Sequence, residues 1–134
     1  AFISSNVGAV HAFAETVGAW FDTPHGVANS LFLPYIMEFN IPACPERFAD
    51  IADAMGIERE ESMSDEQYAL KAVEYVKALN RKLNIPTIKE IKGITEERFE
   101  AIAERSANNV LSNDNARKIT KEDYLELLKK AYNE

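Results

Sequence analysis

The sequence has a single cysteine, Cys44, among its 134 residues. One thiol excludes an internal disulfide and any zinc or iron–sulfur cage built from cysteines. Cations are also scarce, because 15 lysines and arginines stand against 22 aspartates and glutamates, for a net charge of −7. A nucleic-acid interface needs an excess of positive charge opposite the phosphates, so we expect no nucleic-acid partner.

Long apolar runs are missing as well. No stretch reaches the roughly 20 apolar residues that cross a bilayer, and the N-terminus lacks the basic and then apolar pattern of a secretory signal. We therefore expect a cytoplasmic protein with no membrane partner. A hydrophobic content of 46% over 134 residues is enough for one ordinary core, which predicts a single domain over residues 1–134.

Alternating apolar and polar residues do not occur, and apolar residues instead repeat every three or four positions, which predicts an all-helical bundle. The first helix runs through Val7, Val10, Phe13 and Val17. It has no capping residue ahead of it, which suggests that the chain begins inside an element. The second helix is predicted over 25–39, with Thr23 as its N-cap and proline at its first position.

Four more helices are predicted from their start signals. One begins at Pro45 and ends at Gly56, and three follow Ser64, Thr95 and Thr120. The helix after Ser64 carries one apolar stripe, which consists of Tyr68, Ala72, Tyr75, Val76, Leu79 and Leu83.

The only two histidines, His11 and His25, lie within the first 25 residues. On a helix His11 and Glu15 share one face, and His25 sits just past the next helix start, where its ring can point back toward the first helix. Imidazole is the commonest ligand of divalent transition metals such as zinc and iron(II). A catalytic metal needs about three or four protein ligands, and this chain adds only carboxylates such as Glu15, Asp22 or Glu38. From the residues alone, a metal site and two structural histidines both stay open.

Residues 8–19, 22–29 and 33–40 resemble the metal-binding core of the iron-containing (group III) alcohol dehydrogenases. In that family a His-x-x-x-His helix, a Pro-His-Gly turn and a Leu-Pro-x-x-Met-x-x-Asn helix follow one another in this order and with this spacing. Weaker similarity continues to the end of the chain, where Asn115-Ala116-Arg117 stands at the usual Asn-Pro-Arg. The resemblance thus covers the whole sequence.

The resemblance implies the helical fold of the C-terminal domain of dehydroquinate synthase-like and iron-containing alcohol dehydrogenases. It implies that His11 and His25 are two of four ligands of one divalent metal, iron(II) or alternatively zinc, and that an Asp and a His upstream of this chain complete the set. It also implies an NAD(P)-binding domain on the amino-terminal side. The activity implied is hydride transfer between NAD(P) and a small alcohol or aldehyde, with the metal as Lewis acid.

On this hypothesis the chain is the C-terminal part of a larger two-domain enzyme. We expect it to be inactive by itself and to be homo-oligomeric in the complete form. Two alternatives stay open: a stand-alone helical interaction module with structural histidines, and a small independent metalloprotein that uses His11, Glu15 and His25 together.

Glu15 departs from the family pattern, because it occupies the position of the second histidine of His-x-x-x-His. This carboxylate is our candidate catalytic residue. It can relay protons, bind the metal, or pair with a cation of the missing part. Phe13, Trp20 and Phe21 are interpreted either as walls of the substrate pocket or as core residues, and Asp22 as a turn former.

Overall fold

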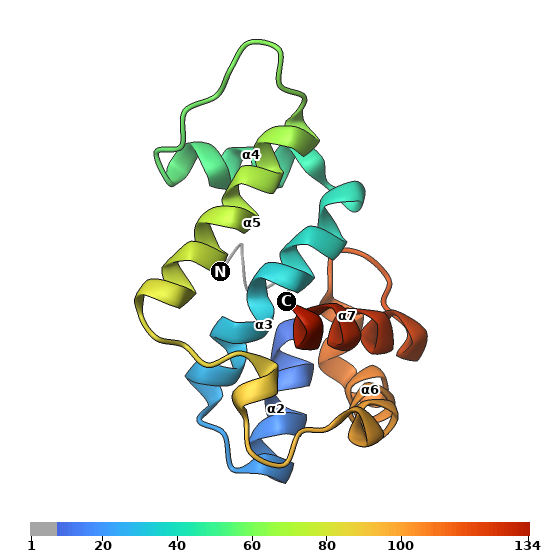
Figure 1. Ribbon diagram of the computed structural model, residues 1–134. Coiled ribbons are helices and arrows are strands. Elements are labelled where there is room, and N and C mark those ends of the chain that lie inside the picture. The colour runs from blue at the N-terminus through green and yellow to red at the C-terminus, as the bar shows by residue number, and fades with distance from the viewer. Residues whose placement is uncertain (1–7) are drawn as a thin grey trace.

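The computed structural model describes residues 8–134, so the predictions that fall on residues 1–7, including the uncapped start of the first helix, lie outside it. The helices are α2 (Gly8–Phe21), α3 (His25–Asn40), α4 (Pro45–Ala54), α5 (Asp65–Lys82), α6 (Phe99–Asn108) and α7 (Lys121–Asn133). Four short 3-10 turns join them: η1 (Ile41–Ala43), η2 (Ile88–Glu90), η3 (Glu96–Arg98) and η4 (Val110–Asp114). No strand occurs in residues 8–134, which confirms the all-helical fold (Figure 1).

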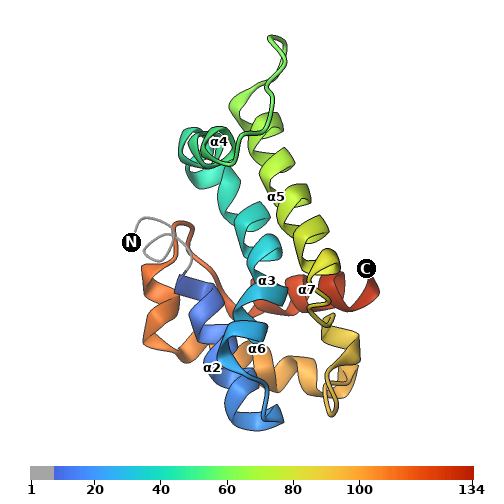
Figure 2. The same cartoon turned by 90° about the vertical axis from the view of Figure 1, so that its left-hand side faces the viewer.

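The buried side chains form two clusters that α3 connects. The larger cluster draws on α2, α3, α6 and α7, and the smaller one on α4, α5 and the end of α3. Phe32 and Ile36 of α3 belong to the first cluster, and Met37 to the second. Figure 2 shows the result: α4 and the start of α5 stand at one end, and α2, α6 and α7 at the other.

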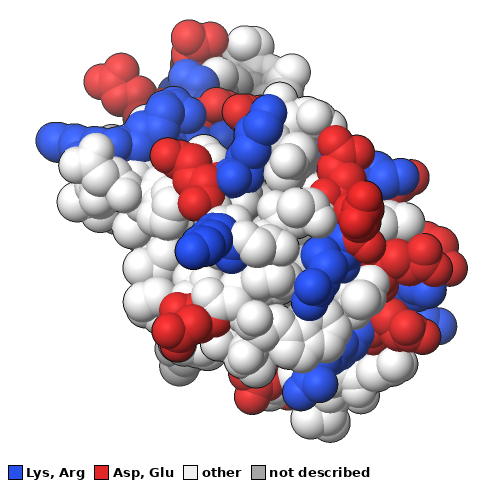
Figure 3. All heavy atoms as spheres, turned by 60° about the horizontal axis from the view of Figure 1, so that its bottom comes forward, with Lys and Arg blue, Asp and Glu red and all other residues white. Residues whose placement is uncertain are grey.

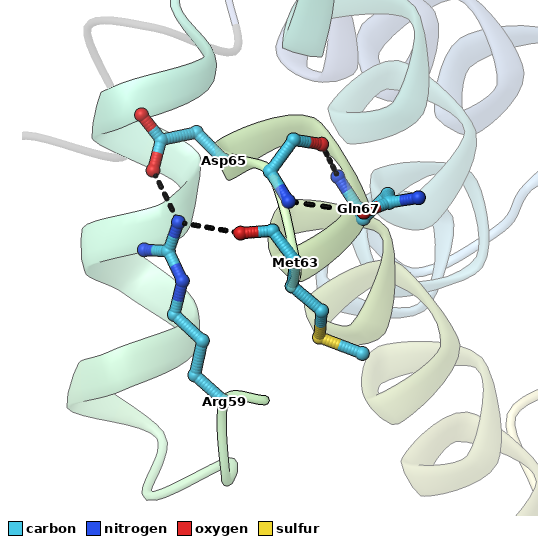
Figure 4. A network of polar contacts seen from close by, with 5 residues as sticks. Arg59, Met63, Asp65 and Gln67 are labelled. Carbon is cyan, nitrogen blue, oxygen red and sulfur yellow. Dashed lines mark hydrogen bonds and ion pairs between the residues drawn. The ribbon is translucent and has the colours of Figure 1, made fainter. Parts of the chain in front are cut away.

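Side-chain caps mark the starts of two of the predicted helices, α5 and α7. Ser64 forms a complete capping box with Gln67 at the start of α5, and Thr120 forms one with Asp123 at the start of α7. Arg59 reinforces the first of these by donating to Met63 O at 3.1 Å and pairing with Asp65 at 2.9 Å (Figure 4). These boxes satisfy backbone N–H groups that have no partner in the first turn of a helix.

Two helix starts differ from the prediction by one turn or less. Pro24, not Thr23, is the N-cap residue of α3, because its ψ of 137° is extended and helical geometry begins at His25. After Thr95 the chain first forms the 3-10 turn η3, and α6 begins only at Phe99. Both differences affect only the ends of helices, where the backbone often changes its hydrogen-bonding pattern.

The apolar stripe predicted on α5 is only half buried, so that prediction was partly wrong. Tyr68, Ala72 and Val76 are buried, whereas Tyr75, Leu79 and Leu83 are between 40% and 62% exposed. The reason is that α5 packs against α4 and α3, and its buried face also includes Ala69 and Val73. That face is therefore rotated away from the three exposed residues.

Charge is distributed without a single-sign surface on the face where α2 ends and α3 begins. In Figure 3 the Lys and Arg side chains of this face are interspersed with Asp and Glu. Within residues 8–134 every helix is too short or too polar to traverse a lipid bilayer. Cys44 is a free, half-buried thiol, and burial raises its pKa.

Candidate metal centre

A three-residue connection brings the two histidine-bearing helices together. Asp22 adopts a left-handed backbone conformation with φ of 52° directly after α2. Asp tolerates this region better than most residues, which agrees with its interpretation as a turn former. The reversal lets α2 pack on α3, with the rings of Phe13 and Phe32 stacked at 4.0 Å between centroids.

The imidazoles of His11 and His25 lie side by side across this helix pair. Their ring centroids are 5.9 Å apart, and the ring planes differ by 17°. With nitrogen–metal bonds of about 2.1 Å, the centroids of two imidazoles that share one ion lie roughly 5 to 6.5 Å apart. His11 is half buried and His25 is exposed. The separation and the chemistry of the donors therefore fit two ligands of one divalent cation.

Glu15 points to a different partner. Its Oε2 accepts a hydrogen bond of 2.7 Å from Nδ2 of Asn109, which follows α6. Within residues 8–134 no group of three or more His, Cys, Asp or Glu side chains is arranged to hold a metal ion. The hypothesis of an independent metalloprotein that uses His11, Glu15 and His25 thus lacks its three-ligand cluster.

The three aromatic residues near the histidines have different roles. Phe13 is fully buried in the core, so the interpretation of this residue as a pocket wall was wrong. Trp20 is 36% exposed and lies 5.4 Å below the guanidinium of Arg105. Phe21 is half buried, with the guanidinium of Arg98 at 5.3 Å from its ring. Such cation–π contacts hold the end of α2 against η3 and the last turn of α6.

Buried hydroxyls hold the start of α2, and the sequence patterns did not reveal them. Tyr124 of α7 is fully buried, and its hydroxyl lies 2.7 Å from Ser112 Oγ and donates to Ala9 O at 3.4 Å. Ser112 Oγ in turn donates to Ser106 O at 2.6 Å. Burial raises the pKa of Tyr124 to about 12. The phenol is therefore uncharged at neutral pH and serves as a hydrogen-bonding link between α2, η4 and α7.

A reciprocal amide pair holds the end of α3 against the segment before α7. Asn40 donates to Asn115 Oδ1 at 2.9 Å, and Asn115 donates to Asn40 Oδ1 at 2.7 Å. Beside it Arg117 donates to Phe39 O at 2.9 Å and covers the Phe39 ring at 4.2 Å. Two of the segments that carry the family resemblance are thus bonded to each other.

Substituting Asn115 by alanine is expected to lower the free energy of unfolding by about 2 to 4 kcal/mol, because it removes the two amide hydrogen bonds that join Asn115 to the fully buried Asn40. Urea denaturation followed by circular dichroism measures the change. Asn113→Ala is the matched control, since Asn113 is exposed in the same region, and should stay within about 0.5 kcal/mol of the wild type. Equal losses in the two variants would contradict a specific role for the amide pair.

The C-terminal profile of the Fe-containing alcohol dehydrogenase family matches residues 1–132. Lactaldehyde reductase of Escherichia coli is 39% identical over 131 residues, which are 98% of this chain and 34% of the relative. 1,3-propanediol dehydrogenase of Citrobacter freundii is 35% identical over 132 residues, with the same coverage.

Among solved structures, an alcohol dehydrogenase from Oenococcus oeni superimposes with a TM-score of 0.86 at 40% identity, over 95% of this chain and 33% of that one. A 1,3-propanediol oxidoreductase superimposes with a TM-score of 0.84 at 34% identity, over 92% of this chain and 32% of that one. The chain thus spans about a third of the length of these relatives. It belongs to the Fe-containing alcohol dehydrogenase family, as the C-terminal region of that family.

Proposed function

We propose that this chain is the C-terminal helical domain of an NAD(P)-linked alcohol dehydrogenase that depends on a divalent metal, iron(II) first and zinc as the alternative. The observation that supports it most directly is the 5.9 Å separation of the His11 and His25 rings. Family membership adds the reaction class. The names of the relatives, which refer to lactaldehyde and 1,3-propanediol, favour a small alcohol or aldehyde as the substrate.

In this proposal His11 and His25 hold two of the coordination positions, and the Asp and His implied by the resemblance complete the set from the upstream part. A divalent cation held there supplies a Lewis acid that lowers the pKa of an alcohol hydroxyl and polarises an aldehyde carbonyl. The packing of α2 on α3 through the buried Phe13 and Phe32 rings brings the two imidazoles close to each other. The hydride acceptor belongs to the NAD(P) domain.

For Glu15 we propose a role in proton transfer and not in metal binding. Its Oε2 is engaged by Asn109, and within the described residues Oε1 has no hydrogen-bond partner. The side chain is exposed on the same helix as His11, one turn further along. A carboxylate placed in this way can hold a proton near the reacting hydroxyl without competing for the cation.

The two remaining proposals concern the assembly. The complete enzyme is proposed to be a homo-oligomer in which residues 1–134 form one helical domain beside an amino-terminal NAD(P) domain. Its cytoplasmic location stays a prediction.

Expression of this chain alone and of the longer polypeptide encoded by its reading frame tests the function. Elemental analysis should find about one iron or zinc per longer polypeptide and little in the isolated chain, because a site with two of four ligands binds weakly. Reduction of NAD(P) with short alcohols should occur only in the longer polypeptide. Tight metal binding by the isolated chain, or a metal-free but active longer polypeptide, would contradict the proposal.

A further inference from the structure

A cavity of about 160 Å³ lies between α3, α5, η2 and the end of α7. Its apolar wall includes Leu31, Ile85, Ile88 and Ala131. The C-terminus lies beside it, next to the end of α5 (Figure 2). Neither histidine nor Glu15 lines this cavity, so it is separate from the metal centre and does not depend on the proposed function.

Two cationic side chains line the cavity, and only one of them has a carboxylate partner among the described residues. Lys77, Arg81 and Glu134 all line it. Lys77, whose side chain is only 10% exposed, pairs with Glu134 at 2.7 Å, whereas its contact with the exposed Glu74 is 3.9 Å. Within residues 8–134 Arg81 forms no ion pair or hydrogen bond with a side chain. The guanidinium of Arg81 is therefore available to a ligand in this cavity.

Tyr35 adds an uncharged group to the same lining. Its ring lies 5.0 Å from Lys77 Nζ. Burial first, and then the carboxylates of Glu134 and Glu38, raise the pKa of Tyr35 to about 12. The phenol therefore keeps its proton at neutral pH and contributes a hydroxyl donor but no negative charge.

We propose that this cavity binds a short-chain monocarboxylate, with the carboxylate on Arg81 and the hydrocarbon chain against Leu31, Ile85 and Ile88. A guanidinium offers two parallel N–H groups that match a carboxylate. The Lys77–Glu134 pair in the same lining is a carboxylate–cation contact of this kind.

Size and polarity favour this ligand class over inorganic phosphate. The cavity volume is about five times the roughly 30 Å³ that one water molecule occupies in the liquid. This size suits a ligand of about six non-hydrogen atoms, such as butyrate. Half of the lining residues are apolar and offer no hydrogen-bond donors. The oxygens of a phosphate that face them would lose their bound water and gain no hydrogen bond in its place. A hydrocarbon chain gains from the same surface.

The test is a titration of the isotope-labelled longer polypeptide with sodium butyrate, followed by amide chemical shifts. We expect saturable shifts at Leu31, Ile88 and Ala131, with a dissociation constant on the order of millimolar. Arg81→Gln should weaken binding about tenfold, because it removes the charge-assisted hydrogen bonds. Lys82→Gln is the matched control, since Lys82 is an exposed cation on the same helix outside the lining, and should change binding less than twofold.

Two further measurements distinguish a carboxylate site from a purely apolar cavity. Glu134→Gln should tighten butyrate binding several-fold, because it removes one negative charge from the lining and frees Lys77 as a second cation. Butyramide, the uncharged analogue, should bind at least tenfold more weakly than butyrate. Equal binding of the two, equal losses in Arg81→Gln and Lys82→Gln, stronger shifts with phosphate, or no saturable shift with butyrate would each overturn the proposal.

Discussion

Replacing His25 by alanine in the longer polypeptide is expected to weaken its affinity for iron(II) or zinc by roughly 10²- to 10³-fold. Four-ligand structural zinc sites gain about 10 to 16 kcal/mol on binding, or about 3 to 4 kcal/mol per ligand, and each 1.4 kcal/mol is a factor of ten in affinity. Dehydrogenase activity at limiting metal should fall in parallel. Competition with a chelating dye measures the affinity, and NAD(P) reduction measures the activity.

Unfolding does not account for such a loss, because His25 is exposed and forms no hydrogen bond within the described residues. The free energy of unfolding of His25→Ala without metal should stay within about 0.5 kcal/mol of the wild type. Glu15→Gln is the companion variant. It keeps an oxygen acceptor for the Asn109 amide, so metal affinity should not change, while the pH dependence of kcat should. Metal loss in Glu15→Gln as large as in His25→Ala would show that Glu15 is a ligand.

Replacing Gly8 by alanine is expected to destabilise the chain by about 3 kcal/mol or more, at the upper end of the usual overpacking range. A Cβ atom at Gly8 would lie 2.2 Å from Leu111 O and 3.0 Å from the backbone of Asp114. Both contacts are with main-chain atoms of η4, so α2 has to move as a whole. Urea denaturation should show the lost stability, and the moved α2 should also weaken metal binding through His11 in the longer polypeptide.

Gly26→Ala is the matched control for Gly8→Ala. Gly26 lies in the first turn of α3, and a Cβ there meets no atom within 4 Å. Alanine favours the helix by about 1 kcal/mol over glycine in a helix interior, so this variant should be as stable as the wild type or slightly more so. If Gly26→Ala lost as much stability as Gly8→Ala, the contact with η4 would not be the cause of the Gly8→Ala loss. Helix propensity or packing elsewhere would then explain it.

Several parts of the fold followed from local sequence signals. The helix starts after Ser64 and Thr120, the proline that opens α4 and the left-handed Gly56 were all confirmed. These features depend on residues within one helical turn, so their geometry is encoded where they occur. The histidines were recognised in the same way, because the resemblance depends on short motifs with fixed spacing.

Other features depend on contacts between distant segments, and only the tertiary structure decided them. Asn109 is 94 residues from its partner Glu15, and Asn115 is 75 residues from Asn40. The burial of α5 likewise depends on which face meets α3 and α4.

By itself the sequence determined most of the helices, their start signals and the two imidazoles of the proposed metal centre, because each is specified by neighbours within a few residues. The tertiary structure decided that Phe13 is a core residue, that Glu15 pairs with an amide, and that Lys77, Arg81 and Glu134 surround one cavity. The physical reason is that long-range packing selects one face of each helix, and no periodic pattern specifies which partner that face will meet.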